Sequence, residues 1–360
     1  MPRIRIKDIA RIAGVSPGTV DRVIHNRGGV SESTRKKIEK IIEEYGYQRD
    51  ILAGALAANK SYTILLCMPE TVDAHAFWKF PEAGVHRAMD ELQHFDIDVA
   101  YLRFDQHDPA DFLHKIEEID PRDYDGLLFA PVFRENSKEF IRRWREAGVP
   151  CVLFNSYLEQ VEYNSFIGQD AFQSGYLGGK LMSYGLAPGN DILIINLSLR
   201  KDNYEHITER EKGFRAFFEE HSERVNNLVS LNLNGGSYDE LALEIDRKMD
   251  ALNVNGIFVT NSRVHLIARY LSEKGAMYVR LIGYDLLPES VEFLKREYID
   301  FLISQSPEEQ AYLGMRSLYN SIILKKEEAR KVFLPIDILT KENVDYYLKF
   351  NEAYEQPERS

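Results

Sequence analysis

The sequence of 360 residues contains only two cysteines and two tryptophans. Cys67 and Cys151 each lie within an apolar run, so we expect reduced core residues and no disulfide. No apolar run reaches the roughly 18 to 20 residues that span a bilayer. The first residues include Arg3, Arg5 and Lys7 where a signal peptide would have an apolar core. We therefore expect a cytosolic protein without a membrane segment.

Motifs that mark common enzymes are also missing. The sequence has no Gly-x-x-x-x-Gly-Lys-Ser/Thr loop, no Gly-x-Ser-x-Gly elbow, no His-Glu-x-x-His and no Gly-x-Gly-x-x-Gly after a strand. The histidines are scattered without the spacing of metal ligands. We therefore expect no enzyme activity, no cofactor and no metal site.

Positive charge is scarce on average, because the formal net charge is −12. Residues 1–60, however, contain 12 Lys or Arg and 7 Asp or Glu, whereas the remaining residues contain 33 and 50. A basic N-terminal segment on an acidic body is suited to contacting phosphates through that segment alone. Such binding should weaken steeply with salt.

The N-terminal segment predicts two short amphipathic helices joined by a glycine turn. Apolar residues recur at helical spacing over residues 6–13, and Gly14 tolerates the positive φ of a tight turn. Ser16 can cap the next helix, and Pro17 suits its first position. This second helix would present small polar residues and Arg22 to solvent, the arrangement of a helix-turn-helix that enters a major groove. An ordinary helical hairpin is the alternative.

A third helix is predicted to follow, with Ser31 as its cap. Its expected buried stripe consists of Ile38, Ile41, Ile42 and Tyr45. The helix should end at Gly46. Residues 50–58 are weakly apolar and predict a short helix that would be marginal in water.

Residues 4–60 resemble the headpiece of the lactose-repressor (LacI/GalR) family of bacterial transcription regulators. The resemblance rests on the elements Asp-Ile-Ala, Ala-Gly-Val-Ser, Thr-Val-Asp-Arg-Val and Gly-Tyr. It implies that residues 50–58 form a hinge helix and that Leu56 wedges into the DNA minor groove. The residues expected to contact operator DNA are Ser16, Pro17, Gly18, Thr19, Arg22, His25, Ser31, Thr34, Tyr47 and Leu56. Pro17, Gly18 and Asp21 depart from many relatives, and Asp21 would repel a nearby phosphate, so operator preference should depend on Arg22.

From residue 62 onward, apolar runs alternate with helical stretches, which predicts parallel sheets covered on both faces by helices. The predicted strands are 63–68, 98–102, 126–131, 149–154, 191–197, 225–231, 256–260, 279–283 and 301–304. The predicted helices are 81–94, 110–119, 135–147, 171–184, 209–221, 239–250, 263–274 and 307–323. A loose repeat of residues 124–131 at 254–261 fits two Rossmann-like lobes.

Residues 62–340 resemble the effector domain of the same family, which is similar to periplasmic binding proteins. The resemblance implies an all-α helix-turn-helix headpiece joined to two Rossmann-like α/β lobes of parallel sheet (type I periplasmic-binding-protein-like). It also implies that the chain crosses between the lobes near 156–163, 302–307 and 330–335. The expected organisation is a DNA-binding domain 1–48, a hinge helix and linker 49–61, an N-lobe 62–157 plus 306–331, a C-lobe 162–301 plus 334–340, and a tail 341–360.

Polar and aromatic residues at the predicted strand ends are the candidates for binding a ligand between the lobes. They are Phe77, Trp78, Asn155, Arg210, Asn261, Asp285 and Gln305. Arg210 and Asp285 match the family elements Arg-x-x-Gly-Phe and Gly-Tyr-Asp, whereas Asn155 and Ser262 stand where many relatives have aspartate. Each candidate could instead be a strand-end cap or a turn residue. Other cations lie near predicted strand ends, namely Arg134, Lys201 and Arg263, so an acidic sugar or a phosphate is an alternative ligand.

These features together predict a transcription regulator, a repressor, whose operator affinity is switched by a sugar or sugar acid between the lobes. We expect a homodimer on a pseudo-palindromic operator, associated with the nucleoid when bound. Residues 346–360 lack a leucine heptad, so no coiled-coil tetramer is expected. The alternatives are a ligand-independent regulator with a non-functional cleft, and a sensor of a phosphorylated or nucleobase ligand.

Overall fold

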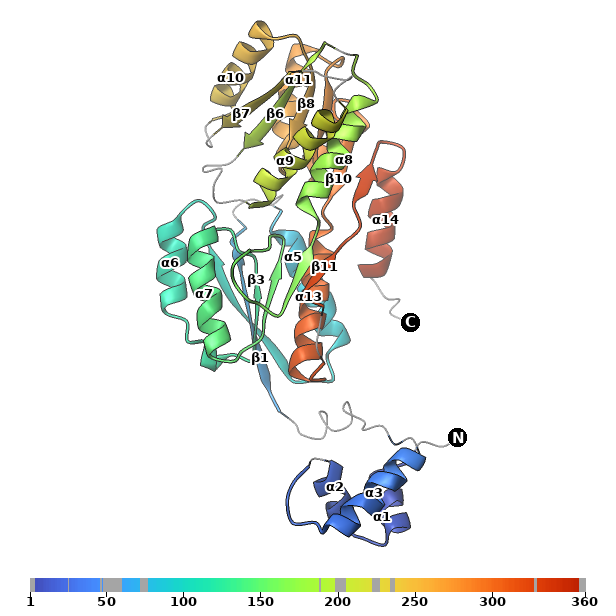
Figure 1. Ribbon diagram of the computed structural model, residues 1–360. Coiled ribbons are helices and arrows are strands. Elements are labelled where there is room, and N and C mark those ends of the chain that lie inside the picture. Colours follow the sequence, from blue (N-terminus) through green and yellow to red (C-terminus); the bar gives the residue numbers. More distant parts are fainter. Residues whose placement is uncertain are drawn as a thin grey trace. The chain divides into compact units, whose positions relative to one another are not determined.

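The computed structural model describes residues 4–24, 26–45, 47, 60–71, 77–187, 189–197, 205–221, 227–233, 237–326 and 329–355. The chain divides into two compact units, residues 1–58 and residues 59–360 (Figure 1). The predicted hinge helix, with Leu56, and the DNA-contact candidate His25 lie outside the described residues. No helix among the described residues is long and apolar enough to cross a membrane.

The first unit contains three helices, α1 (Ile6–Ala13), α2 (Pro17–Ile24) and α3 (Glu32–Glu44). Gly14 ends α1 with a φ of 69°, as the turn prediction required. Ser16 Oγ accepts a hydrogen bond of 3.2 Å from the backbone N–H of Thr19, and Ser31 Oγ accepts one of 3.2 Å from Thr34. The predicted caps of α2 and α3 are therefore confirmed.

A small core holds these three helices together. Its buried members are Ile9, Ala10, Ala13, Val20, Val23, Ile38 and Ile41. The prediction that Tyr45 belongs to this core is wrong, because Tyr45 follows the last turn of α3 and is 52% exposed. Tyr47 packs against the core instead. The helical period placed Tyr45 inward, but α3 ends one residue before it.

The second unit begins with a six-stranded parallel sheet in the order β11-β5-β4-β3-β1-β2. Its strands are β1 (Tyr62–Pro69), β2 (Ile97–Phe104), β3 (Gly126–Phe129), β4 (Cys151–Phe154), β5 (Ser165–Gly168) and β11 (Lys331–Phe333). Its helices are α5 (Lys79–Glu91), α6 (Pro109–Glu117), the short 3-10 helix η1 (Pro121–Asp123), α7 (Arg134–Glu146) and α13 (Pro307–Ile322). We call this part the first lobe.

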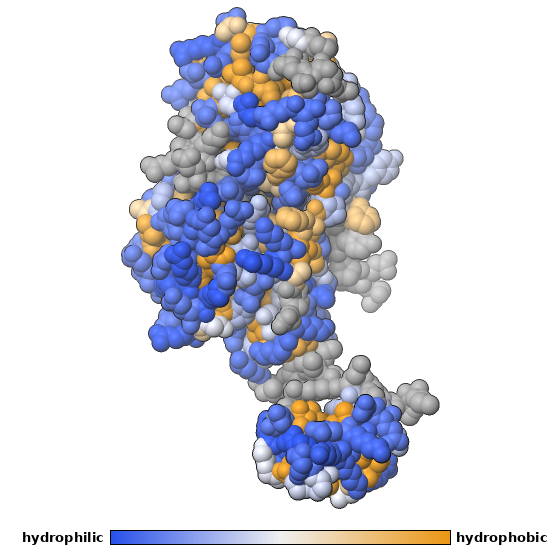
Figure 2. Space-filling view, in the orientation of Figure 1, coloured by the Kyte–Doolittle hydropathy of each residue, from blue (hydrophilic) through white to orange (hydrophobic). Residues whose placement is uncertain are grey.

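Helices cover both faces of the first sheet (Figure 1). On one face, Phe129 of β3 stacks at 6.0 Å on Phe112 of α6 and meets Phe140 of α7 edge-on. On the other face, a Cβ added at Gly314 of α13 would lie 2.6 Å from Leu128 of the same strand. Successive residues of β3 therefore face opposite helical layers. Figure 2 shows hydrophilic residues over most of the visible surface of α6 and α7.

The second lobe contains another six-stranded sheet, in the order β12-β10-β9-β8-β6-β7, with only the β10–β12 pair antiparallel. Its strands are β6 (Asp191–Leu197), β7 (Leu228–Leu233), β8 (Val254–Val259), β9 (Arg280–Tyr284), β10 (Phe301–Ser304) and β12 (Asp337–Leu339). Its helices are α8 (Ala171–Ser183), α9 (Glu205–Glu220), α10 (Tyr238–Ala251), α11 (Val264–Lys274), α12 (Pro288–Lys295) and α14 (Val344–Glu355).

Alternate residues of β6 enter two separate cores in this lobe. Ile192 and Ile194 pack with residues of α8 and α9, whereas Leu193 and Ile195 pack with residues of α10, α11 and α12. The apolar strand is thus buried on both faces, as the sequence pattern predicted.

The structure corrects the predicted start of the C-lobe at residue 162. β5 pairs with β4 in the first sheet, so the first lobe continues to Gly168. The second sheet likewise continues to Ser304, so the second crossing starts only there, later than the predicted 302. The tail predicted over 341–360 contains α14, whose Val344 is fully buried in the core of the second lobe.

Candidate functional site

The position of α9 depends on close packing against α8. A Cβ added at Gly175 of α8 would lie 2.0 Å from the carbonyl oxygen of Arg210. A Cβ added at Gly213 of α9 would lie 1.9 Å from the carbonyl oxygen of Phe172. Glycine at these two positions lets the helix backbones touch, and this contact fixes Arg210 beside the edge of the second sheet.

Arg210 is buried, with 1% of its surface exposed. Its Nη1 donates a 2.8 Å hydrogen bond to the carbonyl oxygen of Thr260, after β8, and its Nη2 donates to Gln305 Oε1. The guanidinium carbon lies 3.8 Å from the ring centre of Tyr284. Among the described residues, Nε of Arg210 has no hydrogen-bond partner. Burial lowers the pKa of this guanidinium from its usual value.

Asp285 lies next to Arg210 at the end of β9, and Gln305 stands between the two charges. Gln305 donates to Asp285 from Nε2 at 2.6 Å and from its backbone N–H at 3.3 Å. Asp285 is 2% exposed and has a φ of 68°. Burial raises the pKa of this carboxyl to about 6, against the opposing effects of the Arg210 charge and the Gln305 hydrogen bonds.

Asn155, at the end of β4, connects the first lobe to this group. Its backbone N–H donates a 2.8 Å hydrogen bond to Gln310 Oε1 of α13, and Gln310 Nε2 donates at 2.7 Å to the carbonyl oxygen of Gln305. Asn155 has a φ of 67°. The structure therefore brings together four of the predicted residues, directly or through Gln310: Asn155, Arg210, Asp285 and Gln305.

The remaining three candidates make other contacts. Asn261 uses its side chain within its own lobe, since Nδ2 donates to the Leu197 carbonyl at 2.7 Å and Oδ1 accepts from the N–H of Arg263 at 3.1 Å. Trp78 is buried, donates from Nε1 to Gln106 at 3.1 Å and meets Phe77 edge-on at 5.0 Å. Among the described residues, no hydrogen bond joins Trp78 to the Arg210 group.

Sequence reasoning missed two contacts that join the lobes at the first turn of α9. Ser156 Oγ lies 2.7 Å from His206 Nδ1, and Arg134 Nη1 of α7 lies 2.7 Å from Glu205. Burial, together with the charge of Arg210, lowers the pKa of His206 well below its usual value, so the imidazole is neutral. The predicted helix started at residue 209 and left out this turn. The spacing of His206 four residues before Arg210 could have indicated it.

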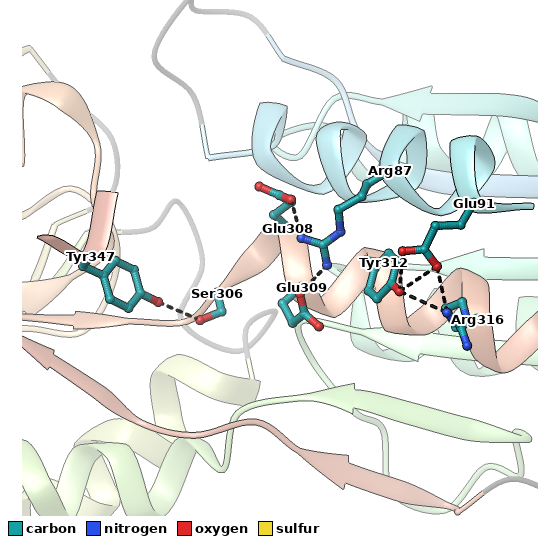
Figure 3. Close-up of polar contacts among 8 residues, drawn as sticks. All are labelled: Arg87, Glu91, Ser306, Glu308, Glu309, Tyr312, Arg316 and Tyr347. Carbon is teal, nitrogen blue, oxygen red and sulfur yellow. Dashed lines mark hydrogen bonds and ion pairs between the residues drawn. The ribbon is translucent and has the colours of Figure 1, made fainter. Parts of the chain in front are cut away.

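Helix α13 follows Gln305 directly and lies alongside α5 (Figure 3). Ser306, at the start of α13, lies 3.2 Å from the hydroxyl of Tyr347 of α14. In the first turn of α13, Glu308 pairs with Arg87 of α5 at 2.8 Å, and Glu309 pairs with the same arginine. Tyr312 then donates to Glu91 at 2.9 Å. Helix α13 therefore contacts the second lobe through Ser306 and Tyr347, and α5 of the first lobe through Glu308, Glu309 and Tyr312.

In the first unit, α2 presents its predicted DNA-contact residues on one side. Ser16, Pro17, Gly18 and Arg22 are exposed, Thr19 is half-buried, and Val20 and Val23 face the core. Asp21 pairs with Arg27 at 3.5 Å, so its charge is partly compensated within the unit. Ser31 and Thr34 engage each other at the cap of α3, with 2.8 Å between their hydroxyl oxygens.

Comparisons with known proteins agree with both units. Residues 5–50 match the model of bacterial regulatory proteins of the lacI family, and residues 66–327 match that of the periplasmic binding protein domain. The chain is 24% identical over 351 residues to the probable HTH-type transcriptional repressor ExuR of Bacillus subtilis, covering 95% of this chain and 98% of that protein. It is 23% identical to the sucrose operon repressor of Streptococcus mutans, covering 94% and 99%.

Solved structures show the same architecture. A putative LacI transcriptional regulator from Bacteroides fragilis has a TM-score of 0.74 and 29% identity, and covers 80% of this chain and 100% of its own. A solute-binding protein from Burkholderia graminis, in complex with D-arabinose, has a TM-score of 0.70 at 18% identity, covers 79% and 97%, and shows the fold alone. The chain belongs to the lacI family of bacterial regulatory proteins, with a helix-turn-helix unit for DNA and a periplasmic binding protein domain as its body.

Proposed function

We propose that this protein is a transcriptional repressor whose operator affinity is switched by a small hydroxyl-rich ligand, a sugar or sugar acid, bound between the lobes. The observation that carries the proposal is the buried group of Arg210, Gln305 and Asp285. It combines a cation, an amide and a carboxylate at the point where the chain crosses between the sheets. Paired hydroxyl groups can accept from the guanidinium and donate to the carboxylate.

The proposed ligand residues differ in their roles. Arg210, Asp285 and Gln305 would bind hydroxyl groups directly, and Asn155 would add an amide from the first lobe. Phe77 and Trp78 would offer aromatic surface to the apolar face of a sugar ring. Asn261 would position the loop after β8, since its side chain is already bonded to Leu197 and Arg263.

Ligand binding would act on DNA through the arrangement of the lobes. A ligand can shift the equilibrium between two arrangements only by binding one of them more tightly. The bonds from Asn155 to Gln310 and from Gln310 to Gln305 tie the first lobe to the ligand group, so a ligand on that group would favour one arrangement. The hinge segment, with Leu56 as the proposed wedge, would form or melt in response.

On DNA, the exposed side of α2 would enter the major groove, with Thr19 and Arg22 near base edges. The other operator contacts would come from Ser16, Pro17, Gly18, His25, Ser31, Thr34 and Tyr47. The protein would act as a homodimer in the cytosol, placing two helix-turn-helix units on a pseudo-palindromic operator. It would be a binding protein without catalytic activity.

A ligand screen tests the sensor. The full chain is melted with neutral sugars, sugar acids and sugar phosphates in excess, and each compound that raises the melting temperature is tested for its effect on operator binding. We expect at least one compound to raise the melting temperature and to change the operator affinity. If none shifts either the melting temperature or the operator affinity, the chain is a ligand-independent DNA-binding protein.

Selection of bound operator sequences tests the DNA-reading residue. The unaltered protein, Arg22→Ala and Arg11→Ala are each used to select from a random DNA pool. Arg11 is an exposed arginine of α1 and serves as the matched loss of one positive charge. We expect Arg22→Ala alone to relax the selected sequence, because a bidentate arginine contact is worth about 1–3 kcal/mol of base discrimination. An unchanged sequence preference in Arg22→Ala would contradict the assignment.

A further inference from the structure

Two arginines near the end of β8, Arg210 and Arg263, form no ion pair with a carboxylate among the described residues. Within the described residues, Arg210 donates to the backbone carbonyl of Thr260 and to the side-chain oxygen of Gln305. Arg263 immediately precedes α11 and is half-buried, and no ion pair joins it to a carboxylate within the described part of the chain. Both arginines are close to the end of β8. Arg210 is hydrogen-bonded to Thr260, and Arg263 lies three residues after Thr260 in the sequence.

The burial of Arg210 makes an anionic partner favourable. A guanidinium remains protonated in proteins, and taking it out of water without a carboxylate or phosphate is costly. Its two Nη atoms are engaged, but Nε is a buried donor without a partner among the described residues. A buried donor that is left unbonded costs free energy which an acceptor on a ligand would recover.

The carboxylates near Arg210 make their hydrogen bonds to other residues, and Asp285 acts on Arg210 through its charge alone. Asp285 accepts both of its hydrogen bonds from Gln305, and Glu205 pairs with Arg134. Glu211, the neighbour of Arg210, accepts from Asn196 at 2.8 Å and from Arg215 at 3.0 Å. The ends of β4 and β8 carry the neutral amides Asn155 and Asn261.

The charge of Arg263 acts on a residue of the first lobe. Burial and the positive charge of Arg263 together lower the pKa of His107, which lies after β2, whereas Asp105 opposes the shift. The loops after β2 and β8 therefore bring a neutral imidazole and a cation within range of each other's charge. An anion there would pair with Arg263 and could accept a hydrogen bond from His107.

We propose that the ligand bound between the lobes carries an anionic group, a carboxylate or a phosphate, which Arg263 and Nε of Arg210 bind. This inference rests on the proposed function, because it specifies the chemistry of the same ligand. Arg263 is then the residue that separates an acidic sugar from its neutral counterpart, while Asp285 and Gln305 bind hydroxyl groups of either.

The test uses matched sets of sugars with the full-length protein. Each common aldose is compared with its uronate, its aldonate and its 6-phosphate by thermal melting, and binders are titrated by calorimetry. We expect at least one acid to bind at least tenfold more tightly than its neutral aldose, and the carboxylate and phosphate arms identify which anion is used. If neutral sugars bind as tightly as their acids, the inference is wrong and the proposed function stands. If no compound binds, the proposed function itself fails.

A charge-removing variant then assigns the anion to Arg263. In Arg263→Gln, affinity for the acid should fall about 10- to 100-fold, the usual loss for a charge-assisted hydrogen bond, while affinity for any neutral binder should stay within twofold. Arg269→Gln, on the helix that follows Arg263, is the matched control, since Arg269 is exposed and pairs with Glu273. Melting without ligand verifies that both variants fold. Unchanged affinity for the acid in Arg263→Gln would overturn the inference.

Discussion

Replacing Asp285 by asparagine should stabilise the protein at neutral pH and do so less at lower pH. The folded protein holds the pKa of Asp285 at about 6, above the usual 3.8, because the carboxyl is buried. The folded state therefore binds this proton more tightly than the unfolded chain does. The stability that this carboxyl contributes is fully present below pH 4 and is lost as the pH rises through about 6.

The size of the effect follows from the shift. A difference of about two pKa units corresponds to a cost of about 3 kcal/mol at pH 7 and about 1.5 kcal/mol at pH 5. Asparagine removes this cost but weakens the hydrogen bonds from Gln305, which offsets the gain by about 1–2 kcal/mol. The difference in unfolding free energy between Asp285→Asn and the unaltered protein should thus shrink by about 1.5 kcal/mol from pH 7 to pH 5.

Differential scanning calorimetry of the full chain between pH 5 and pH 8 measures this difference. For a domain of this size, the gap in melting temperature should narrow by roughly 2–4 °C between pH 7 and pH 5. Asp345→Asn, an exposed aspartate of α14 that pairs with Lys295, is the matched control for loss of a surface carboxylate. A gap between Asp285→Asn and the unaltered protein that stays constant with pH would refute the reasoning.

Two other substitutions test the packing and the contact between the lobes. Gly213→Ala should destabilise the body by about 1–3 kcal/mol, because the added methyl group would meet backbone atoms of Phe172 that cannot move aside. Urea unfolding measures this loss. Gly18→Ala, in the exposed part of α2, is the control. Ser156→Ala removes the hydrogen bond to His206 that joins the lobes. Calorimetry should show severalfold weaker ligand binding, although the contacts to the ligand are intact. Equal affinity in the variant and the unaltered protein would mean that this bond does not favour the ligand-bound arrangement.

The fold was largely predictable because most elements carry long apolar signals. β6 is buried at every position and α13 keeps a helical stripe over four turns, so both were found close to their observed bounds. β5 and β11 were missed, since they have only four and three residues and begin with Ser165 and Lys331. Their place in the sheet comes from pairing with each other and with β4, which no local pattern encodes.

The candidate site was predictable only where a residue carries its own signal. Arg210 and Asp285 lie in recognisable elements, but Gln310 and His206 reach the site through contacts with residues 155 and 50 positions away. Such contacts depend on how two lobes meet. For the same reason, the sequence could not separate Asn261, which holds the loop after β8, from residues that face a ligand.

The two interpretations weighed for each strand-end residue, a turn residue or a ligand residue, are compatible. Asn155 and Asp285 both have a positive φ, at 67° and 68°, and asparagine and aspartate tolerate that conformation better than larger residues do. The sharp turn after β9 directs Asp285 away from the sheet and toward Gln305. At Asn155, the turn presents the backbone N–H to Gln310. A short polar residue therefore meets the demand of the backbone and supplies the polar group, so evidence for a turn at these positions does not count against a role in binding.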